Sequence, residues 1–398
     1  MCEWKNCTIS DLGTIIGGAT PSTKIPAYYD GGEIPWITPK DLACFKGRYI
    51  SHGERNITAA GLRSCSAQML PAHTILFSSR APIGYIAIAA NSVCTNQGFK
   101  SVIPNDHTDY LFLYYLMKYY KNVIESMGSG TTFKEVSAAT MREIKVRVPK
   151  KKRDQHCIAA FLSVLDDKIE NNNQINKNLE QQLHSIFVNH FADHIASATT
   201  DDCPMLQDMI TIVDNRGKTP PLTTNIIDYP IIDVGALKGS GRIVDFNNCT
   251  KYVDQATYST WFRSGHPKPW DILISTVGSL AEMKLYMGNK GCIAQNVVAF
   301  RATNISPLYL YQYLLYIRSD LVAYNIGSVQ PSIKVTHIIK HPIYVPNKKV
   351  MKDFDDIAKP ITEQLFASYN ESENLKKLRS VLLPRLMSGE LDVSKLDI

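Results

Sequence analysis

The chain has 398 residues, of which 44% are hydrophobic and 20% are charged, and this composition excludes a mainly disordered protein. Its length predicts two or three domains. The formal net charge of +6 permits nucleic-acid binding without establishing it. No apolar signal core opens the chain, and no apolar run approaches the roughly 20 residues needed to cross a bilayer, so we expect a cytoplasmic protein.

The nine cysteines are odd in number and widely spaced, and none forms a Cys-x-x-Cys pair. This pattern argues against a disulfide framework and against a zinc ribbon. We expect these cysteines to be reduced and mostly packed in the core.

The second half of the chain repeats the order of features in the first half, at an offset near 199 residues (217 − 18 for the first shared glycine). Each half has a Gly-x-Thr-Pro turn, a Pro-led strand, an apolar strand ending in small polar residues, a Gln-led strand, a Tyr/Leu-rich helix, a Gly-Ser turn and a strand closing in Pro. In the first half these are residues 18–21, 35–37, 75–79, 97–99, 111–120, 128–134 and 144–149. In the second half they are residues 217–220, 230–232, 272–276, 295–297, 308–317, 327–334 and 343–346.

Because the order is kept at a nearly constant offset, we predict a tandem duplication. The alternative is that two mixed stretches share generic turn chemistry. Short strands between Gly, Pro and Asn turns, with few helices, predict an α+β domain in each half. Residues 110–120 are predicted to form its main helix, with Asp109 as N-cap, and we interpret its aromatic residues as core rather than as a base-stacking platform.

A different kind of sequence follows each repeat. Residues 154–190 contain no Gly or Pro, and their apolar residues keep a heptad register. The seam comprises Ile158, Leu162, Leu165, Ile169, Asn172, Asn176, Leu179, Leu183 and Ile186. Polar residues on such a seam fix register and partner at some cost in stability. A helix of about 35 residues is a rod on the order of 50 Å long.

The C-terminal segment has the same pattern, and Pro360 is predicted to lie in the first turn of its helix. Its seam comprises Ile357, Ile361, Leu365, Leu375, Leu378 and Leu382. We predict that the two helices pair as an antiparallel coiled coil within one chain, spacing two domains and docking partners. The alternative is a coiled coil that only dimerises the protein. The predicted boundaries are 1–152 and 196–350 for the recognition domains, and 153–195 and 351–398 for the helices.

These patterns together resemble the specificity subunit of Type I restriction–modification systems over essentially the whole chain. The resemblance lies in the tandem architecture, the two Gly-x-Thr-Pro turns and the helix sequence at 158–172. Further shared signatures are residues 79–84, 96–99, 295–298, 327–330 and 382–391. One departure is that the counterpart of Ser79 and Arg80 reads Ser-Thr-Val-Gly at 275–278, so a DNA role for Arg80 is not carried over to the second half.

The resemblance implies two mixed α/β target-recognition domains that each read one half of a split, asymmetric double-stranded DNA site, with the helices setting the gap. It also implies modification subunits that supply S-adenosylmethionine-dependent adenine methylation. Restriction subunits would supply ATP-driven, Mg-dependent translocation and cleavage. This chain itself is then expected to bind no cofactor or metal and to have no catalytic residue. Half-sites one duplex turn apart are about 34–36 Å apart, within the length of the predicted rod.

The candidate DNA-binding residues are basic, amide or hydroxyl side chains on turns, because Arg and Lys can read guanine and Asn and Gln can read adenine. They are Thr20, Lys24, Lys40, Arg48, Arg80 and Lys134 in the first repeat, and Arg216, Lys218, Thr219, Lys238, Arg242, Gln330 and Lys334 in the second. The basic run at 150–153 either contacts phosphates or is a solvated charge run.

Enzyme motifs are weak in this sequence. The stretch at 219–222 lacks the amide or acid and the aromatic ring of an adenine methyltransferase motif, and no ATP-binding Gly-x-x-x-x-Gly-Lys-(Ser/Thr) occurs. Asp271, Glu282 and Lys284 could hold Mg²⁺ and an attacking water, which leaves a nuclease or a fused modification enzyme as the alternative function. A third reading is a coiled-coil scaffold without DNA preference. The His pairs 190/194 and 337/341 lack the inserted Glu of a zinc protease.

Overall fold

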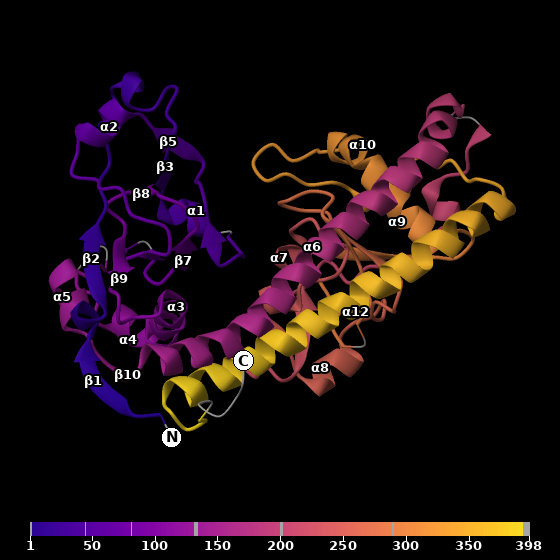
Figure 1. Cartoon of the computed structure of the whole chain (residues 1–398). Helices are drawn as coiled ribbons and strands as arrows, with labels where there is room; N and C mark the ends of the chain where they lie inside the picture. The colour runs from indigo at the N-terminus through magenta and orange to yellow at the C-terminus, as the bar shows by residue number, and fades with distance from the viewer. Residues whose placement is uncertain are drawn as a thin grey trace. The chain divides into compact units, whose positions relative to one another are not determined.

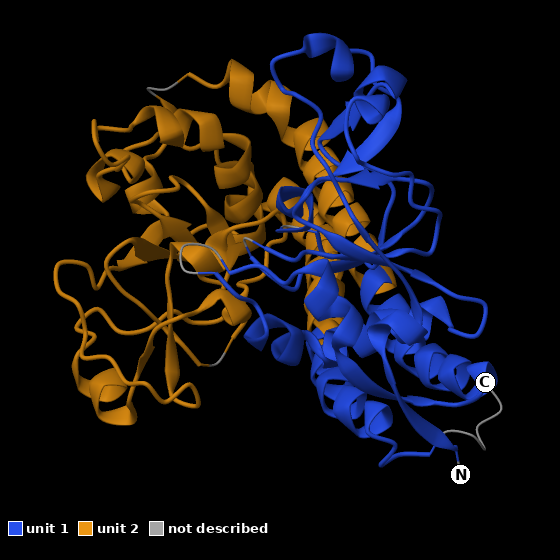
Figure 2. Ribbon diagram, turned by 90° about the vertical axis from the view of Figure 1, so that its left-hand side faces the viewer, with its two compact units in different colours: residues 1–170, 373–398 blue, residues 171–372 orange. Residues whose placement is uncertain are grey.

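The computed structural model describes residues 2–43, 45–80, 82–130, 134–199, 202–288 and 290–392. The chain divides into two compact units, which Figure 2 colours separately: residues 1–170 with 373–398 (unit 1), and residues 171–372 (unit 2). Two long helices, α6 (Lys152–Ser197) and α12 (Lys348–Met387), contribute residues to both units. In the described ranges no helix is long and apolar enough to cross a membrane.

The described residues of unit 1 form three sheets, of five, three and two strands, in the orders β2-β9-β6-β7-β4, β5-β3-β8 and β1-β10. The strands are β1 (Trp4–Thr8), β2 (Gly13–Gly17), β3 (Ile34–Ile37), β4 (Tyr49–Ile50), β5 (Arg55–Ile57), β6 (Ile75–Phe77), β7 (Ile86–Ala89), β8 (Cys94–Thr95), β9 (Lys100–Pro104) and β10 (Lys145–Pro149). The short helices are α1 (Pro39–Ala43), α2 (Ala59–Arg63), α3 (Tyr110–Tyr119), α4 (Lys121–Ser126) and α5 (Ala138–Glu143).

Unit 2 repeats this topology with sheets in the orders β11-β17-β14-β15 and β13-β12-β16. The strands are β11 (Ile210–Val213), β12 (Tyr229–Ile232), β13 (Tyr252–Val253), β14 (Ile272–Ser275), β15 (Met283–Leu285), β16 (Cys292–Ile293) and β17 (Val297–Ala302). The short helices are α7 (Val234–Leu237), α8 (Gln255–Thr260), α9 (Pro307–Tyr316), α10 (Arg318–Ala323) and α11 (Val335–Ile338).

The pairing directions also repeat. In the three-stranded sheets, β3 pairs antiparallel with β5 and parallel with β8, and β12 pairs antiparallel with β13 and parallel with β16. The parallel pairing of β4 with β7 has its counterpart in a bridge between Ile243 and Leu285. The predicted fold class, two tandem mixed α/β domains each followed by a long helix, is confirmed. The predicted domain boundaries stay a prediction, because each compact unit includes part of both helices.

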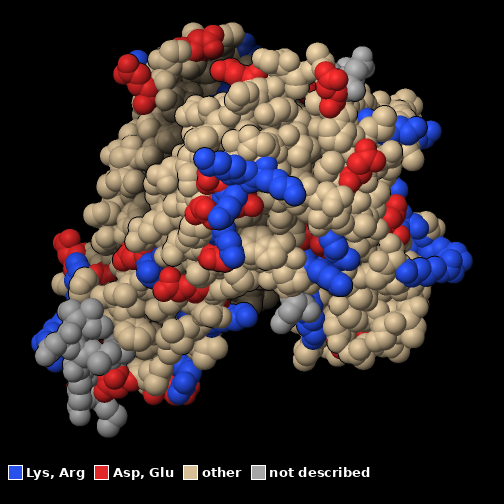
Figure 3. Space-filling model, turned by 90° about the vertical axis from the view of Figure 1, so that its right-hand side faces the viewer, with Lys and Arg blue, Asp and Glu red and all other residues tan. Residues whose placement is uncertain are grey.

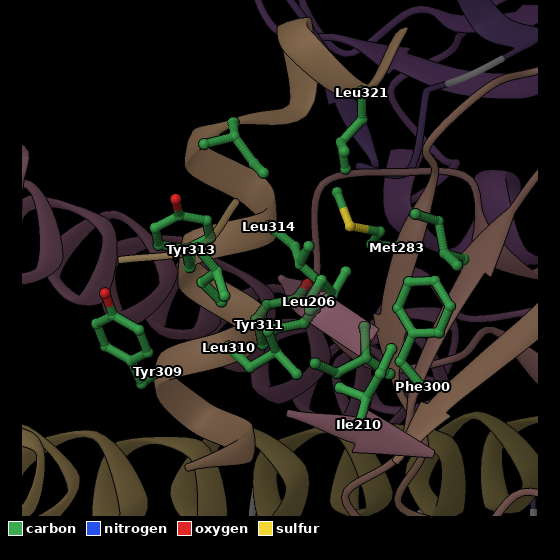
Figure 4. Close-up of a cluster of buried hydrophobic side chains, with 14 of the residues drawn as sticks. Leu206, Ile210, Met283, Phe300, Tyr309, Leu310, Tyr311, Tyr313, Leu314 and Leu321 are labelled. Atoms are coloured by element: carbon green, nitrogen blue, oxygen red, sulfur yellow. The ribbon is translucent and has the colours of Figure 1, made fainter. Parts of the chain in front are cut away.

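The Tyr/Leu-rich helix belongs to the core of each unit. Asp109 caps α3 by accepting the N–H of Phe112, as the sequence predicts, and Ser306 caps α9 with Pro307 in its first turn. In unit 2, Leu310 and Leu314 of α9 face Ile210 and Phe300 of the sheet, as Figure 4 shows. The aromatic residues of α3 and α9 are therefore mostly packing residues, as interpreted from the sequence.

The helices α6 and α12 supply one wall of each core. In unit 2, Phe187 and Phe191 of α6 are fully buried against Tyr309 and against Phe354 of α12. In unit 1, Ile158 and Leu162 of α6 join the core cluster. Ordered side-chain packing of this kind is what makes a long helix with a mixed seam stable.

The two long helices run antiparallel (Figure 1). Asp166 of α6 pairs with Arg379 of α12, and Asn172 donates from Nδ2 to Glu371 at 2.8 Å, so the residue number on α12 falls as that on α6 rises. Asn172 is buried on the seam, as predicted.

Three details predicted for the C-terminal helix are wrong. Ile357 and Leu378 are 41% and 46% exposed on α12 rather than buried on the seam. Pro360 is in the helix interior, where it removes one main-chain hydrogen bond, because α12 begins at Lys348. The start is set by Asn347, whose side-chain oxygen accepts the N–H of Val350 at 3.0 Å.

No disulfide joins the cysteines in the described ranges, and Cys94, Cys249 and Cys292 are buried. Cys44 lies outside those ranges.

Two buried glutamines give a matched test of the packing. Neither amide atom of Gln312 has a partner among the described residues, whereas Gln155 accepts the N–H of Asp109 at 3.0 Å and donates to the carbonyl of Pro149 at 3.1 Å. We expect Gln312→Leu to leave the free energy of unfolding unchanged or raise it by up to about 2 kcal/mol, and Gln155→Leu to lower it by about 1–3 kcal/mol. Chemical denaturation of the full chain checks both, and a larger loss for Gln312→Leu would contradict the packing described.

Candidate nucleic-acid interface

Four loops that are distant in sequence meet at one edge of the main sheet of unit 1. The N–H of Ser79, after β6, donates to the carbonyl of Gly98 at 2.7 Å. The N–H of Val136, after the Gly-Ser turn, donates to the carbonyl of Ser79 at 3.0 Å. Thr20 of the Gly-x-Thr-Pro turn hydrogen-bonds to Gln97. We call residues 18–21, 78–80, 96–99, 128–130 and 134–136 the loop cluster of unit 1. The predicted loops also contain residue 81 and residues 131–133, which lie outside the described residues.

Unit 2 builds the same cluster from the equivalent loops. The N–H of Thr276 donates to the carbonyl of Asn296 at 2.8 Å, and the N–H of Ile333 donates to the carbonyl of Thr276 at 2.8 Å. Gln295 donates from Nε2 to Thr219 of the Gly-x-Thr-Pro turn. The loop cluster of unit 2 comprises residues 217–220, 275–278, 295–297 and 327–334. The shared landmarks in the sequence are therefore the parts of one three-dimensional feature that is built twice.

The two clusters differ in chemistry at equivalent positions. In unit 1, Arg80 forms a backbone bridge with Glu135, and Glu135 lies 3.9 Å from the Arg80 guanidinium and 3.1 Å from the Lys100 ammonium. Two cations thus share one carboxylate, and the Arg80 side chain is partly exposed. In unit 2 the equivalent backbone bridge joins Val277 and Ser332, which carry no charge. The first cluster can donate charged hydrogen bonds where the second offers a methyl surface and a hydroxyl.

The remaining candidate DNA-binding residues differ in the exposure of their side chains and in their ion-pair partners. Lys134 lies within the cluster of unit 1, and the cluster of unit 2 contains Lys218, Thr219, Gln330 and Lys334. All five side chains are exposed. Lys40 pairs with Glu54 and Arg216 with Asp214, each at 2.7 Å. No side-chain hydrogen bond or ion pair joins Lys24, Lys40 or Lys238 to a cluster in the described part of the chain. On the face drawn in Figure 3, Lys and Arg side chains lie in separate groups among Asp and Glu side chains rather than as one basic surface.

Arg48 and Arg242 are the candidates that the structure removes from the DNA-facing set. Their side chains are 5% and 1% exposed, and their guanidinium groups bind carboxylates of α6. A guanidinium that is already buried and paired cannot reach a base edge or a phosphate without leaving its partners. Because both residues lie on predicted turns, the sequence predicts exposed side chains for them, and this prediction is wrong.

The residues of the nuclease alternative do not converge. Asp271 is held by Arg301 at 2.7 Å, and Glu282 by Arg318 at 2.7 Å. The Lys284 ammonium donates to the carbonyls of Gly239 and Gly241. Within the described ranges no group of three or more His, Cys, Asp or Glu residues is placed to hold a metal ion. Nothing in this arrangement supports a magnesium site at these residues.

Gln97 and Gln295 are cluster residues that the sequence shows only as shared landmarks, without indicating a role. In both units the glutamine links its strand to the hydroxyl of the Gly-x-Thr-Pro threonine. The sequence indication of this pair is a Thr and a Gln that occur at equivalent positions in both repeats. Because the pair is common to both units, it is suited to holding the turn in place rather than to distinguishing one DNA sequence from another.

Substitution of Gly18 tests whether the Gly-x-Thr-Pro turn of unit 1 must pack closely against the residues before Gln97. A Cβ at Gly18 would lie 2.1 Å from the carbonyl oxygen of Asn96 and 2.3 Å from that of Thr95, so Gly18→Ala must displace backbone. We expect a loss of about 1–3 kcal/mol in the free energy of unfolding. Gly241→Ala is the control, because a Cβ there meets nothing within 4 Å. Equal stabilities of the two variants would show that the turn is not packed as described.

Comparison with known proteins agrees with this geometry. The family model described as the Type I restriction modification DNA specificity domain matches residues 1–181 and 205–379. The Type I restriction enzyme MjaIX specificity subunit of Methanocaldococcus jannaschii is 32% identical over 423 aligned positions, covering 99% of this chain and 95% of the relative. The Type I restriction enzyme HindI specificity subunit of Haemophilus influenzae is 28% identical over 175 positions, covering 42% of this chain and 38% of the relative.

Among solved structures, the S subunit of a Type I restriction–modification system from M. genitalium superposes with a TM-score of 0.58 at 18% identity, covering 97% of this chain and 96% of that one. This likeness shows a shared fold. With the family model and the full-length relative, it establishes that the chain belongs to the family of Type I restriction–modification DNA specificity subunits.

Proposed function

We propose that this chain is the non-catalytic subunit that gives a Type I restriction–modification complex its DNA specificity, and that each loop cluster reads one half of a bipartite, asymmetric site. The observation that carries the proposal is the same loop cluster built in both units with different side chains at equivalent positions, Arg80 and Glu135 in one and Val277 and Ser332 in the other. Two recognition domains of the same fold, with different side chains at the contacting positions, are suited to two different half-sites.

Within the clusters we assign base or phosphate contacts to the exposed donors. Arg80 can make a bidentate contact to guanine, and Gln330 can make one to adenine. Lys134, Lys218 and Lys334 are exposed cations within the clusters and suit phosphate contacts, which position the protein without reading sequence. Val277 offers the apolar contact that a thymine methyl group accepts.

The helices α6 and α12 are proposed to space the two readers and to dock modification and restriction subunits. Val164, Leu378 and Val381 are 59%, 46% and 55% exposed on these helices, and exposed apolar residues of this kind are typical of surfaces that a partner covers. In this proposal S-adenosylmethionine, ATP and Mg²⁺ are bound by the partner subunits, and this chain contributes recognition and assembly in the cytoplasm.

A hybrid chain tests the division of labour. Residues 202–346 would be replaced by the aligned residues of the M. jannaschii relative, and genomic methyladenine would be mapped in cells that also make the modification subunit. We expect the methylated motif to keep one half and to change the other. A hybrid that assembles and changes both halves, or neither half, would contradict the assignment of one half-site to each unit.

A further inference from the structure

Arg48 and Arg242 lie at equivalent places where the sheet of each unit meets the long helices. The carbonyl of Arg48 accepts the N–H of Ile88 in β7 at 2.8 Å. The carbonyl of Arg242 accepts the N–H of Leu285 in β15 at 2.7 Å. Each main chain is therefore fixed to a strand of the recognition domain, and each side chain extends to the helices.

In unit 1 the Arg48 guanidinium hydrogen-bonds to side chains on three successive turns of α6. It donates from Nε to Glu170 at 3.0 Å and from Nη1 to Ser163 at 2.8 Å, and Nη2 is paired with Asp167. Burial disfavours the cation, but the hydrogen bonds to Glu170 and Asp167 outweigh it and hold the pKa of Arg48 above its ordinary value. The charge is therefore retained, and its donors are directed at the helix.

In unit 2 the Arg242 guanidinium is bidentate to Glu180 of α6, with Nε and Nη2 donating at 3.0 and 2.7 Å. Its Nη1 donates to the hydroxyl of Thr362 on α12 at 2.9 Å, and the group lies over the ring of Tyr311 at 5.3 Å from its centre. This one side chain joins the recognition domain to both helices of unit 2.

The arginine–helix contacts of the two units are equivalent in the two repeats. Thr362 follows Ser163 by 199 residues (362 − 163), which is the offset of the repeat, and each hydroxyl accepts from the Nη1 of its arginine. Both arginines follow a glycine, Gly47 or Gly241, and both are nearly inaccessible to solvent. A duplicated chain has thus kept a guanidinium and a helix hydroxyl in contact in both copies, while Arg80 is found in one copy alone.

We infer that Arg48 and Arg242 are positioning residues that fix the orientation of each recognition domain on the long helices, and that discrimination of the gap between half-sites depends on them. This inference rests on the proposed function. Apolar contacts are non-directional, whereas a planar guanidinium with several directed bonds has one favoured geometry. A buried, hydrogen-bonded ion pair is better suited to specifying an arrangement than to stabilising it. Base recognition within a half-site is then left to the loop clusters.

The test uses the complex of this chain with its modification subunits and synthetic duplexes carrying both half-sites. The duplexes have the native gap, one base pair fewer or one base pair more, and methyl transfer is measured on each. The variants are Arg48→Met and Arg242→Met, which keep the packing of the side-chain stem but remove its bonds. We expect the preference for the native gap to fall on the order of tenfold, as the loss of a charge-assisted hydrogen bond would give, while the accepted bases stay the same.

Two further variants keep the inference open to refutation if a methionine variant does not fold. Ser163→Ala and Thr362→Val each remove one bond to the arginine, and a smaller fall in gap preference is expected. Arg63→Met is the matched control, because Arg63 is exposed and has no ion pair in the described part of the chain. An equal loss of methylation at all three gaps means that the arginines only stabilise the fold, and a change in the accepted bases means that they contact DNA; either result overturns the inference. If the unaltered complex methylates no split site, the proposed function fails instead.

Discussion

Asp166→Ala is expected to lower the free energy of unfolding by about 1–3 kcal/mol, because it removes a buried carboxylate that pairs with a cation and accepts a buried hydroxyl. Asp166 is almost fully buried in unit 1, where it pairs with Arg379 of α12 and accepts the hydroxyl of Tyr115 of α3 at 2.7 Å. Burial and the Asp166 carboxylate both raise the pKa of Tyr115, so its hydroxyl stays a donor at neutral pH. The alanine variant leaves this buried hydroxyl without its acceptor and removes the partner of the Arg379 cation, whose side chain is 29% exposed.

Guanidinium denaturation of the full chain measures this loss. Asp193→Ala is the control, because Asp193 is exposed on the same helix and has no ion pair within the described ranges; its change is expected to stay within about 0.5 kcal/mol. If the Asp166 and Asp193 variants were equally stable, Asp166 would not join the three helices as described.

Arg80→Ala is expected to lower methylation of the native site by about 10- to 100-fold, since a bidentate contact to a base contributes roughly 1–3 kcal/mol of discrimination. Arg80 lies in the loop cluster of unit 1, and its equivalent in unit 2 is Val277. The loss should therefore relax recognition in one half-site and leave the other unchanged. The measurement is methyl transfer to a set of duplexes in which each base pair of each half-site is varied in turn.

Lys145→Ala is the control for Arg80→Ala, because Lys145 is an exposed cation on β10, in a different sheet of unit 1. We expect its effect to be small and equal for all sequences, as for a residue that at most contributes to the general attraction for DNA. A uniform loss for Arg80→Ala, without relaxed recognition at any base pair, would make Arg80 a phosphate contact rather than a base-reading residue.

The repeated fold could be predicted from the sequence because its landmarks are local. A Gly-x-Thr-Pro turn, an apolar strand that ends in Ser or Thr, and an Asp or Ser N-cap each depend on the chemistry of a few neighbouring residues. The heptad pattern predicted the antiparallel helices for the same reason, since side chains on one seam recur every three or four residues. The order of these landmarks in both halves identified the loops that meet in each cluster.

The role of individual charged residues could not be predicted in this way. Arg48 and Arg242 look like exposed turn residues, and only the fold brings them to carboxylates on α6, 122 and 62 residues away in the chain. Asp166 falls beside the apolar seam, and nothing local indicates that Arg379 will neutralise it. The misplaced helix start at Pro360 has a simpler cause: the Asn347 cap defines the first turn, and Pro360 lies in a helix that packing stabilises despite the missing hydrogen bond.

Methylome sequencing tests whether this chain determines which DNA sequence its complex modifies. It compares cells that express this chain with its modification subunit and cells that carry the modification subunit alone. We expect methyladenine at one split, asymmetric motif, present only when this chain is expressed. If the complex is shown to assemble and no new methylated motif appears, the chain is a scaffold without a role in DNA recognition.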